Sequence, residues 1–135
     1  MGIDHGEKRV GVALSDEDSL IAQPHETLAR RDPSALLAAI AALARDNEVG
    51  EIVVGLPLGL DGREGASARR ARRFSERLGE LTGLPIVLWD ERMTTVAAQR
   101  ALGEAGVRAR EQKTMIDRVA AALMLQSYLD AKRGA

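Results

Sequence analysis

The sequence contains no cysteine, which excludes a disulfide framework and thiolate chemistry. Its two histidines, His5 and His25, are too few for a histidine-rich zinc site. Aromatic residues are equally scarce, being only Phe74, Trp89 and Tyr128. The core is therefore expected to be aliphatic, and an aromatic stacking platform for nucleic acid is not expected.

Long hydrophobic runs are also missing. The sequence has no apolar stretch of membrane-spanning length and no hydrophobic signal region at its start. Its 135 residues are 45% hydrophobic and 29% charged, which is ordinary for a globular protein of one domain. We therefore expect a cytoplasmic protein with no membrane partner.

The charge is nearly balanced overall but unevenly distributed. The formal net charge of −1 does not indicate a polyanionic partner. Between residues 63 and 77, however, there are six arginines but only two acidic residues, Glu64 and Glu76. Such a stripe either binds phosphates or is an ordinary solvated helix face, and the sequence alone leaves both interpretations open.

The first sixteen residues form the pattern around which the rest of the chain is interpreted. A short apolar run closes with Asp4, Gly6 supplies a residue that can adopt the positive φ of a tight turn, and a second apolar run covers 9–15. This pattern predicts two adjacent strands with a carboxylate at the end of the first. Gly11, inside the second strand, indicates a bulge or a close approach of other atoms to the backbone.

The remaining pattern alternates helices and strands. A third strand over 21–28 is interrupted by Pro24, which fits an edge position or a bulge. Asp32 and Pro33 are an N-cap and a first helical residue. The further expected elements are helices over 33–47, 67–81, 94–105 and 113–131, strands over 52–55 and 86–89, and polar loops over 58–65 and 106–112.

This order predicts an α/β fold. Three strands in succession form an antiparallel meander, and the alternating helices and strands that follow complete a mixed five-stranded sheet with helices on both faces. In the 67–81 helix, Ala71, Phe74, Leu78 and Leu81 are expected to form the buried stripe.

Acidic residues occur where the active sites of such sheets gather, at the carboxyl ends of the strands. Asp4 ends the first strand, Glu91 or Asp90 follows the last, and Asp117 lies at the edge of the last helix's apolar face. A set of carboxylates suits Mg²⁺ or Mn²⁺, and two such ions would support in-line displacement at a phosphodiester. Spacing alone also allows separate surface acids and a helix cap.

Four motifs then resemble those of one known family. Gly-Ile-Asp-His-Gly-Glu-Lys-Arg-Val-Gly-Val-Ala-Leu-Ser-Asp (2–16), Val-Val-Gly-Leu-Pro-Leu-Gly-Leu-Asp-Gly-Arg-Glu-Gly (53–65), Asp-Glu-Arg-Met-Thr-Thr (90–95), and Lys113 with 117–129 are similar to the ordered motifs of the YqgF family, also called RuvX. The resemblance implies a ribonuclease-H-like fold, with residues 1–135 forming a single nuclease domain.

The resemblance also implies roles for particular residues. Asp4, Glu91 and Asp117 match the family's acids, and would be both catalytic residues and ligands of a two-metal Mg²⁺ or Mn²⁺ site. The expected nucleic-acid-binding residues are those matching its basic positions, together with the arginine face of the 67–81 helix: Lys8, Arg9, Arg69, Arg70, Arg73, Arg92 and Lys113. His5, where the family often has proline, would either titrate near neutrality or be a turn residue facing water.

The function implied is that of a hydrolase acting on ester bonds. We expect a divalent-metal-dependent endonuclease that processes the 5′ end of pre-16S rRNA in ribosome biogenesis. One alternative is a Holliday junction resolvase on branched DNA, which generally needs two sites and hence a homodimer. Another is a non-catalytic nucleic-acid-binding module, disfavoured because all three acids are present. A nucleotide-using phosphotransferase ranks lower, because it usually needs a second domain.

Overall fold

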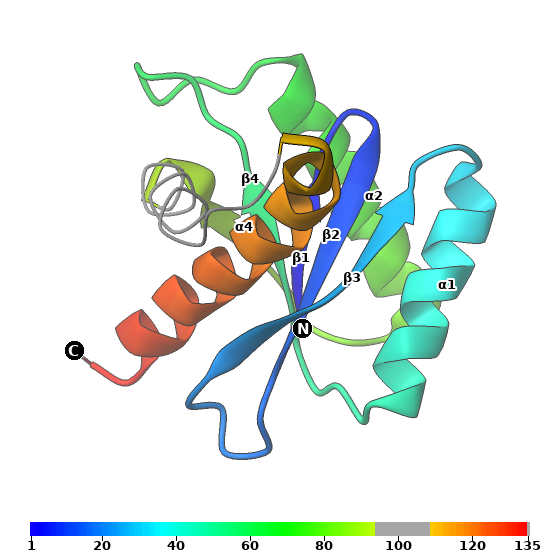
Figure 1. Ribbon diagram of the computed structural model, residues 1–135, viewed down its shortest axis with the longest axis vertical. Coiled ribbons are helices and arrows are strands. Elements are labelled where there is room, and N and C mark those ends of the chain that lie inside the picture. Colours follow the sequence, from blue (N-terminus) through cyan, green and yellow to red (C-terminus); the bar gives the residue numbers. More distant parts are fainter. Residues whose placement is uncertain (94–108, 135) are drawn as a thin grey trace.

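A computed structural model describes residues 1–93 and 109–134, with side chains for 1–92 and 115–134 (Figure 1). Its strands form one sheet in the order β3-β2-β1-β4-β5. They are β1 (Gly2–His5), β2 (Arg9–Ser15), β3 (Ala22–Ala29), β4 (Ile52–Leu56) and β5 (Ile86–Asp90). The first three strands pair antiparallel, and β4 runs parallel to both β1 and β5. The predicted mixed five-stranded sheet is confirmed.

Helices cover both faces of this sheet (Figure 1). The helices α1 (Pro33–Asp46) and α2 (Ala66–Thr82) pack on one face, and α4 (Ala109–Lys132) crosses the other. As predicted, Asp32 caps α1, because its Oδ1 accepts a hydrogen bond of 3.0 Å from the Ser34 amide. A short 3₁₀ turn, η1 (Glu91–Met93), follows β5. The helix expected over 94–105 lies outside the described residues.

The alternation of side chains along the strands divides the core in two. Ile3, Val12 and Val54 are fully buried toward α1 and α2, where they meet residues such as Phe74 and Leu78. Ala13 and Val53 are buried on the opposite face against Ala121, Met124 and Leu125 of α4. Strand β4 is buried on both faces, as its uninterrupted apolar sequence predicts.

Two irregular positions of the meander are explained by packing. A Cβ built on Gly11 would lie 1.9 Å from the Asp117 carbonyl oxygen, so α4 can cross β2 here only because residue 11 has no side chain. This is the predicted close approach. Strand β3 is an edge strand, and the ladder shifts register between the pairs Val12–Glu26 and Ala13–Pro24, which accommodates the proline as predicted.

Some details of the sequence-based prediction were wrong. Leu81 is 55% exposed, and the buried stripe of α2 is instead completed by Ala68 and Ser75. Residues 109–112 belong to α4 and not to a loop, since no proline or glycine interrupts 107–133 to stop a helix. The apolar run 86–89 predicts a buried strand, but β5 is only half-buried, because it lies at the end of the sheet.

Gly6 does not adopt the positive φ expected of it. Its amide instead donates a hydrogen bond of 3.0 Å to the Arg9 carbonyl, and a Cβ there would lie 2.7 Å from that same oxygen. The glycine is required by the closeness of the two strands and not by left-handed backbone geometry.

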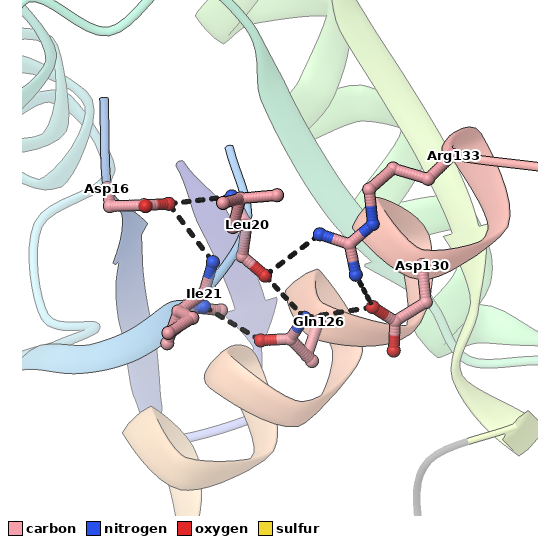
Figure 2. A network of polar contacts seen from close by, with 7 residues as sticks. Asp16, Leu20, Ile21, Gln126, Asp130 and Arg133 are labelled. Carbon is pink, nitrogen blue, oxygen red and sulfur yellow. Dashed lines mark hydrogen bonds and ion pairs between the residues drawn. The ribbon is translucent and has the colours of Figure 1, made fainter. Parts of the chain in front are cut away.

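The turn between β2 and β3 is joined to α4 by a network of hydrogen bonds (Figure 2). Asp16 Oδ1 accepts hydrogen bonds from the amides of Leu20 (2.7 Å) and Ile21 (3.0 Å), which shapes the turn. The Gln126 side chain then pairs with the strand edge, accepting from the Ala22 amide at 2.8 Å and donating to the Leu20 carbonyl at 2.9 Å. Arg133 donates to the same carbonyl.

None of the helices within the described ranges offers the length of apolar sequence that a membrane crossing requires.

We expect Gln126→Leu to lower the free energy of unfolding by about 1–3 kcal/mol, because it leaves the part-buried Ala22 amide without its acceptor. Urea denaturation followed by circular dichroism measures this. Gln23→Leu is the matched control, since Gln23 is exposed on β3 and makes no hydrogen bond through its side chain in the described part of the chain. Equal losses for the two variants would contradict a specific role for Gln126.

Candidate metal centre

Two of the predicted acids meet across the middle strand of the parallel part of the sheet. Asp4 lies on β1 and Glu91 directly follows β5, while β4 runs between these strands. A Cβ built on Gly55 of β4 would lie 2.3 Å from Glu91 Oε1, so the Glu91 side chain crosses β4 where a side chain is missing. Glu91 thereby reaches Asp4 and shares a hydrogen bond with it.

This contact changes the protonation of Asp4. Burial first, and then the hydrogen bond and the charge of Glu91, raise the pKa of Asp4 from 3.8 to about 9. Two carboxyl groups in contact and away from water cannot both be ionised cheaply, so the pair holds one proton at neutral pH in the absence of a cation.

Asp117 approaches the same place from the other side, on α4. Its Oδ1 lies 3.6 Å from the position of a Cβ on Gly6, and its Oδ2 accepts a hydrogen bond of 2.9 Å from Arg9 Nε. Burial raises the pKa of Asp117, the Arg9 hydrogen bond opposes this, and the charge of Asp4 raises it further. Asp117 therefore lies within electrostatic range of Asp4 while neutralised by Arg9.

The alternative between Asp90 and Glu91 is resolved by their contacts. The Asp90 carboxylate turns toward solvent and binds Arg92, with 2.6 Å between Asp90 Oδ2 and Arg92 Nη2. This pairing lowers the pKa of Asp90. Glu91 is the residue that faces Asp4, as expected of neighbouring positions at a strand end.

The three acids are not arranged as a complete set of metal ligands. Among the side chains described, those of residues 1–92 and 115–134, no three His, Cys, Asp or Glu are grouped as a metal-binding cluster. Asp4 and Glu91 are joined by a hydrogen bond, and one Asp117 oxygen is occupied by Arg9.

Three of the predicted basic residues, Lys8, Arg9 and Arg92, lie next to the acids in the sequence or in contact with them, and they differ in exposure and pairing. Lys8 is exposed on the turn between β1 and β2, Arg9 is bound to Asp117, and Arg92 is bound to Asp90. Arg92 Nη1 also lies 3.6 Å from a Cβ position on Gly62, next to the loop after β4. The side chain of Lys113 lies outside the described residues.

The predicted arginines of α2 lie on a helix that packs on the face of the sheet opposite α4. Arg69 and Arg73 are exposed, whereas Arg70 is half-buried and donates a hydrogen bond of 3.0 Å to Ser67 Oγ. Arg70 also lies 3.8 Å from Glu7, on the turn between β1 and β2.

Both sequence-based interpretations of His5 were wrong. Its ring stacks on Phe74, with 4.5 Å between centroids and 27° between planes. Burial first, and then the charges of Arg30 and Arg70, lower the pKa of His5 to about 4. His5 is therefore a half-buried strand residue stacked on Phe74, and it does not titrate near neutrality.

Sequence reasoning missed Arg30. Its Nη1 donates hydrogen bonds to the carbonyls of Gly6 (3.1 Å) and Glu7 (3.0 Å), which fixes the turn that follows Asp4. A single arginine in a polar connection after the third strand carries no local signal of this contact.

A family model described as "RuvX: Holliday junction resolvase" matches residues 1–131 of the chain. The chain belongs to this family. A protein of Anaeromyxobacter sp. (strain Fw109-5) named "Putative pre-16S rRNA nuclease" is 48% identical over 132 residues, which are 98% of this chain and 96% of that protein. A protein of the same name from Syntrophus aciditrophicus (strain SB) is 46% identical over 131 residues, which are 97% of this chain and 87% of that protein.

A solved structure has the same fold. The chain described as "T. thermophilus RuvC in complex with Holliday junction substrate" superposes with a TM-score of 0.64 over 99% of this chain and 94% of that chain, at 17% sequence identity. This match, with the strand order and the placement of the helices, establishes the ribonuclease-H-like fold that the motifs predicted.

The raised pKa of Asp4 predicts how stability depends on pH. Because the folded protein holds a proton on Asp4 that the unfolded chain releases near pH 4, the contribution of Asp4 to stability falls between about pH 4 and pH 9. Asp4→Asn keeps a donor toward Glu91 but cannot ionise. In EDTA the variant should therefore melt increasingly above wild type as the pH rises from 5 to 9. Raising the pH by two within this window should widen the difference by about 2.7 kcal/mol, or roughly 10 °C in melting temperature.

The matched control is Asp18→Asn, an exposed acid on the β2–β3 turn. Its melting temperature should follow that of wild type at each pH. A constant difference between Asp4→Asn and wild type from pH 5 to pH 9 would show that the two carboxyl groups do not share a proton.

Proposed function

We propose that this protein is a divalent-metal-dependent endonuclease whose cleavage centre comprises Asp4, Glu91 and Asp117. The observation that carries the proposal is the contact of Asp4 with Glu91 across Gly55, with Asp117 within range of their charge. Membership of the RuvX family and the names of its relatives support a nuclease.

The residues present fit Mg²⁺ or Mn²⁺. The donors are carboxylate oxygens, which hard cations prefer. Burial and the nearness of Glu91 raise the pKa of Asp4 well above its usual value. A cation would replace the shared proton and relieve this repulsion. Asp4, Glu91 and Asp117 would hold one or two ions, which when bound supply an activated water and stabilise the leaving oxygen.

The chain's own residues prepare this site. Gly55 admits Glu91 to the centre, and Gly11 lets α4 bring Asp117 close to β1. Arg9 neutralises Asp117 through its Oδ2, which leaves Oδ1 as the oxygen that would bind a cation. Arg9 would thus orient Asp117 at the site and place a positive charge beside the substrate phosphate.

Lys8, Arg92 and the arginines of α2 are proposed to position the nucleic-acid backbone. Contacts to phosphates fix the register of a substrate without reading its sequence. Binding through them should weaken as salt rises.

The favoured substrate is pre-16S rRNA, because the relatives carry that substrate in their names, and the motif resemblance favours its 5′ end as the place of cleavage. Branched DNA is the second candidate, on the description of the family, and would call for a homodimer with two sites. A non-catalytic binding module is the third, and would not need to keep Glu91 and Asp4 in such an unfavourable contact.

We expect Asp117→Asn to abolish Mn²⁺-stimulated cleavage while keeping the fold and nucleic-acid binding, because asparagine still accepts the Arg9 hydrogen bond but lacks the charge. A loss of at least about 100-fold in cleavage rate is expected for a group that acts on the reacting centre. Cleavage of labelled RNA with Mn²⁺ and binding in EDTA measure the two properties. Asp18→Asn should cleave as wild type does, and undiminished cleavage by Asp117→Asn would overturn the assignment.

A second experiment distinguishes the substrates. The same preparation, with the same metal ion, is given pre-16S rRNA and a four-way DNA junction at equal concentrations. We expect the rate with the RNA to be at least tenfold higher, with product ends at the 5′ side of the mature rRNA. Symmetric cuts in the junction at the higher rate would favour the resolvase.

A further inference from the structure

A hollow opens between α1 and α2, on the face of the sheet opposite α4. It has a volume of about 220 Å³. Leu36 and Leu37 of α1 and Phe74 of α2 contribute its apolar floor, beside the ring of His5. None of these residues belongs to the acidic centre.

Arginines surround this floor. Arg70, Arg73 and Arg77 project from one side of α2, since their spacing of three and four places them on one helix face, and Arg30 stands on the opposite wall. No acidic residue lines the hollow among the residues that the structure describes. Arg73 and Arg77 are exposed, and neither forms an ion pair with a carboxylate among the described residues.

The hollow and the acidic centre are lined by adjacent residues of β1, His5 and Asp4. Successive side chains of β1 point to opposite faces of the sheet, so Asp4 faces Glu91 while His5 turns to Phe74 and the hollow. A nucleic-acid strand that contacts both the acids and the arginines must therefore cross the end of β1.

An apolar floor with a cationic rim suits a ligand that has a flat, weakly polar body and an anionic group. Nucleoside phosphates have this chemistry, and arginine binds phosphate oxygens through two parallel N–H groups. We propose that the hollow binds one unpaired nucleotide of the substrate strand, with its base on the apolar floor and its phosphate on Arg73 and Arg77.

The proposal rests on the proposed function in taking nucleic acid as the substrate. It adds a preference that the acids cannot supply. Bases inside a continuous duplex are paired and stacked, whereas a bulge or loop offers an unpaired base at little cost. The hollow would thus direct cleavage to irregular positions of a structured RNA.

The test measures binding in EDTA, so that cleavage plays no part. Three labelled RNAs are compared by fluorescence anisotropy: a continuous duplex, the same duplex with one unpaired nucleotide, and that RNA with an abasic residue at the unpaired position. We expect wild type to bind the bulged RNA about tenfold more tightly than the duplex. The abasic RNA should lose most of this advantage, because the contact of the base with the apolar floor supplies it.

The double variant Arg73→Ala/Arg77→Ala should bind the bulged RNA no more than about twofold more tightly than the duplex, because in the proposal the base is held on the apolar floor only while these arginines bind its phosphate. Both positions are exposed on a helix, where alanine is well tolerated. The matched control removes the same charge at the other end of the sheet, through Arg45→Ala/Lys132→Ala, and should keep the tenfold preference. A preference retained by Arg73→Ala/Arg77→Ala, or absent from wild type, overturns the proposal.

Titration with AMP separates a strand-borne nucleotide from a free one. Micromolar binding of AMP, together with equal affinity for the three RNAs, would assign the hollow to a free nucleotide and overturn the proposal. The two proposals also fail differently. A protein that prefers the bulged RNA but cleaves nothing with Mn²⁺ would refute the endonuclease alone, and cleavage without that preference would refute the hollow's role alone.

Discussion

The contact between Asp4 and Glu91 across Gly55 is the constraint on which the site depends. The two residues come from β1 and from the end of β5, and these strands are separated by β4. Any side chain at position 55 would occupy the path of Glu91. The strand order and one missing Cβ therefore decide together whether two carboxyl groups far apart in the sequence can share a hydrogen bond.

Holding this contact is unfavourable, and neighbouring residues reduce the cost. Protonation lets Asp4 donate to Glu91, and Arg9 neutralises Asp117. The close crossing of α4 over Gly11 then keeps Asp117 near this pair. An arrangement that raises the pKa of two of its three acids is more typical of a functional site than of a structural one.

Local patterns were sufficient for most of the fold, but not for contacts between distant elements. The Asp32 cap, the buried strand β4 and the close approach at Gly11 follow from residue types and spacing. The stacking of His5 on Phe74 and the hold of Arg9 on Asp117 join residues far apart in the chain, and no periodicity reports them. Whether Asp90 or Glu91 faces the centre depends on where β5 ends, which a pattern locates only within a few residues.

The alternation of side chains on β1 also separates the two proposed binding sites at one strand end. Asp4 and His5 are adjacent in sequence, yet one lies among carboxyl groups under α4 and the other on an apolar floor beneath α1 and α2. Cation binding requires gathered negative charge, whereas phosphate binding requires positive charge, and the two sets of charged side chains lie on opposite faces of the sheet. Under the two proposals a substrate crossing the end of β1 meets both surfaces, so the site of cleavage and the choice of nucleotide are set by different faces of the same strand.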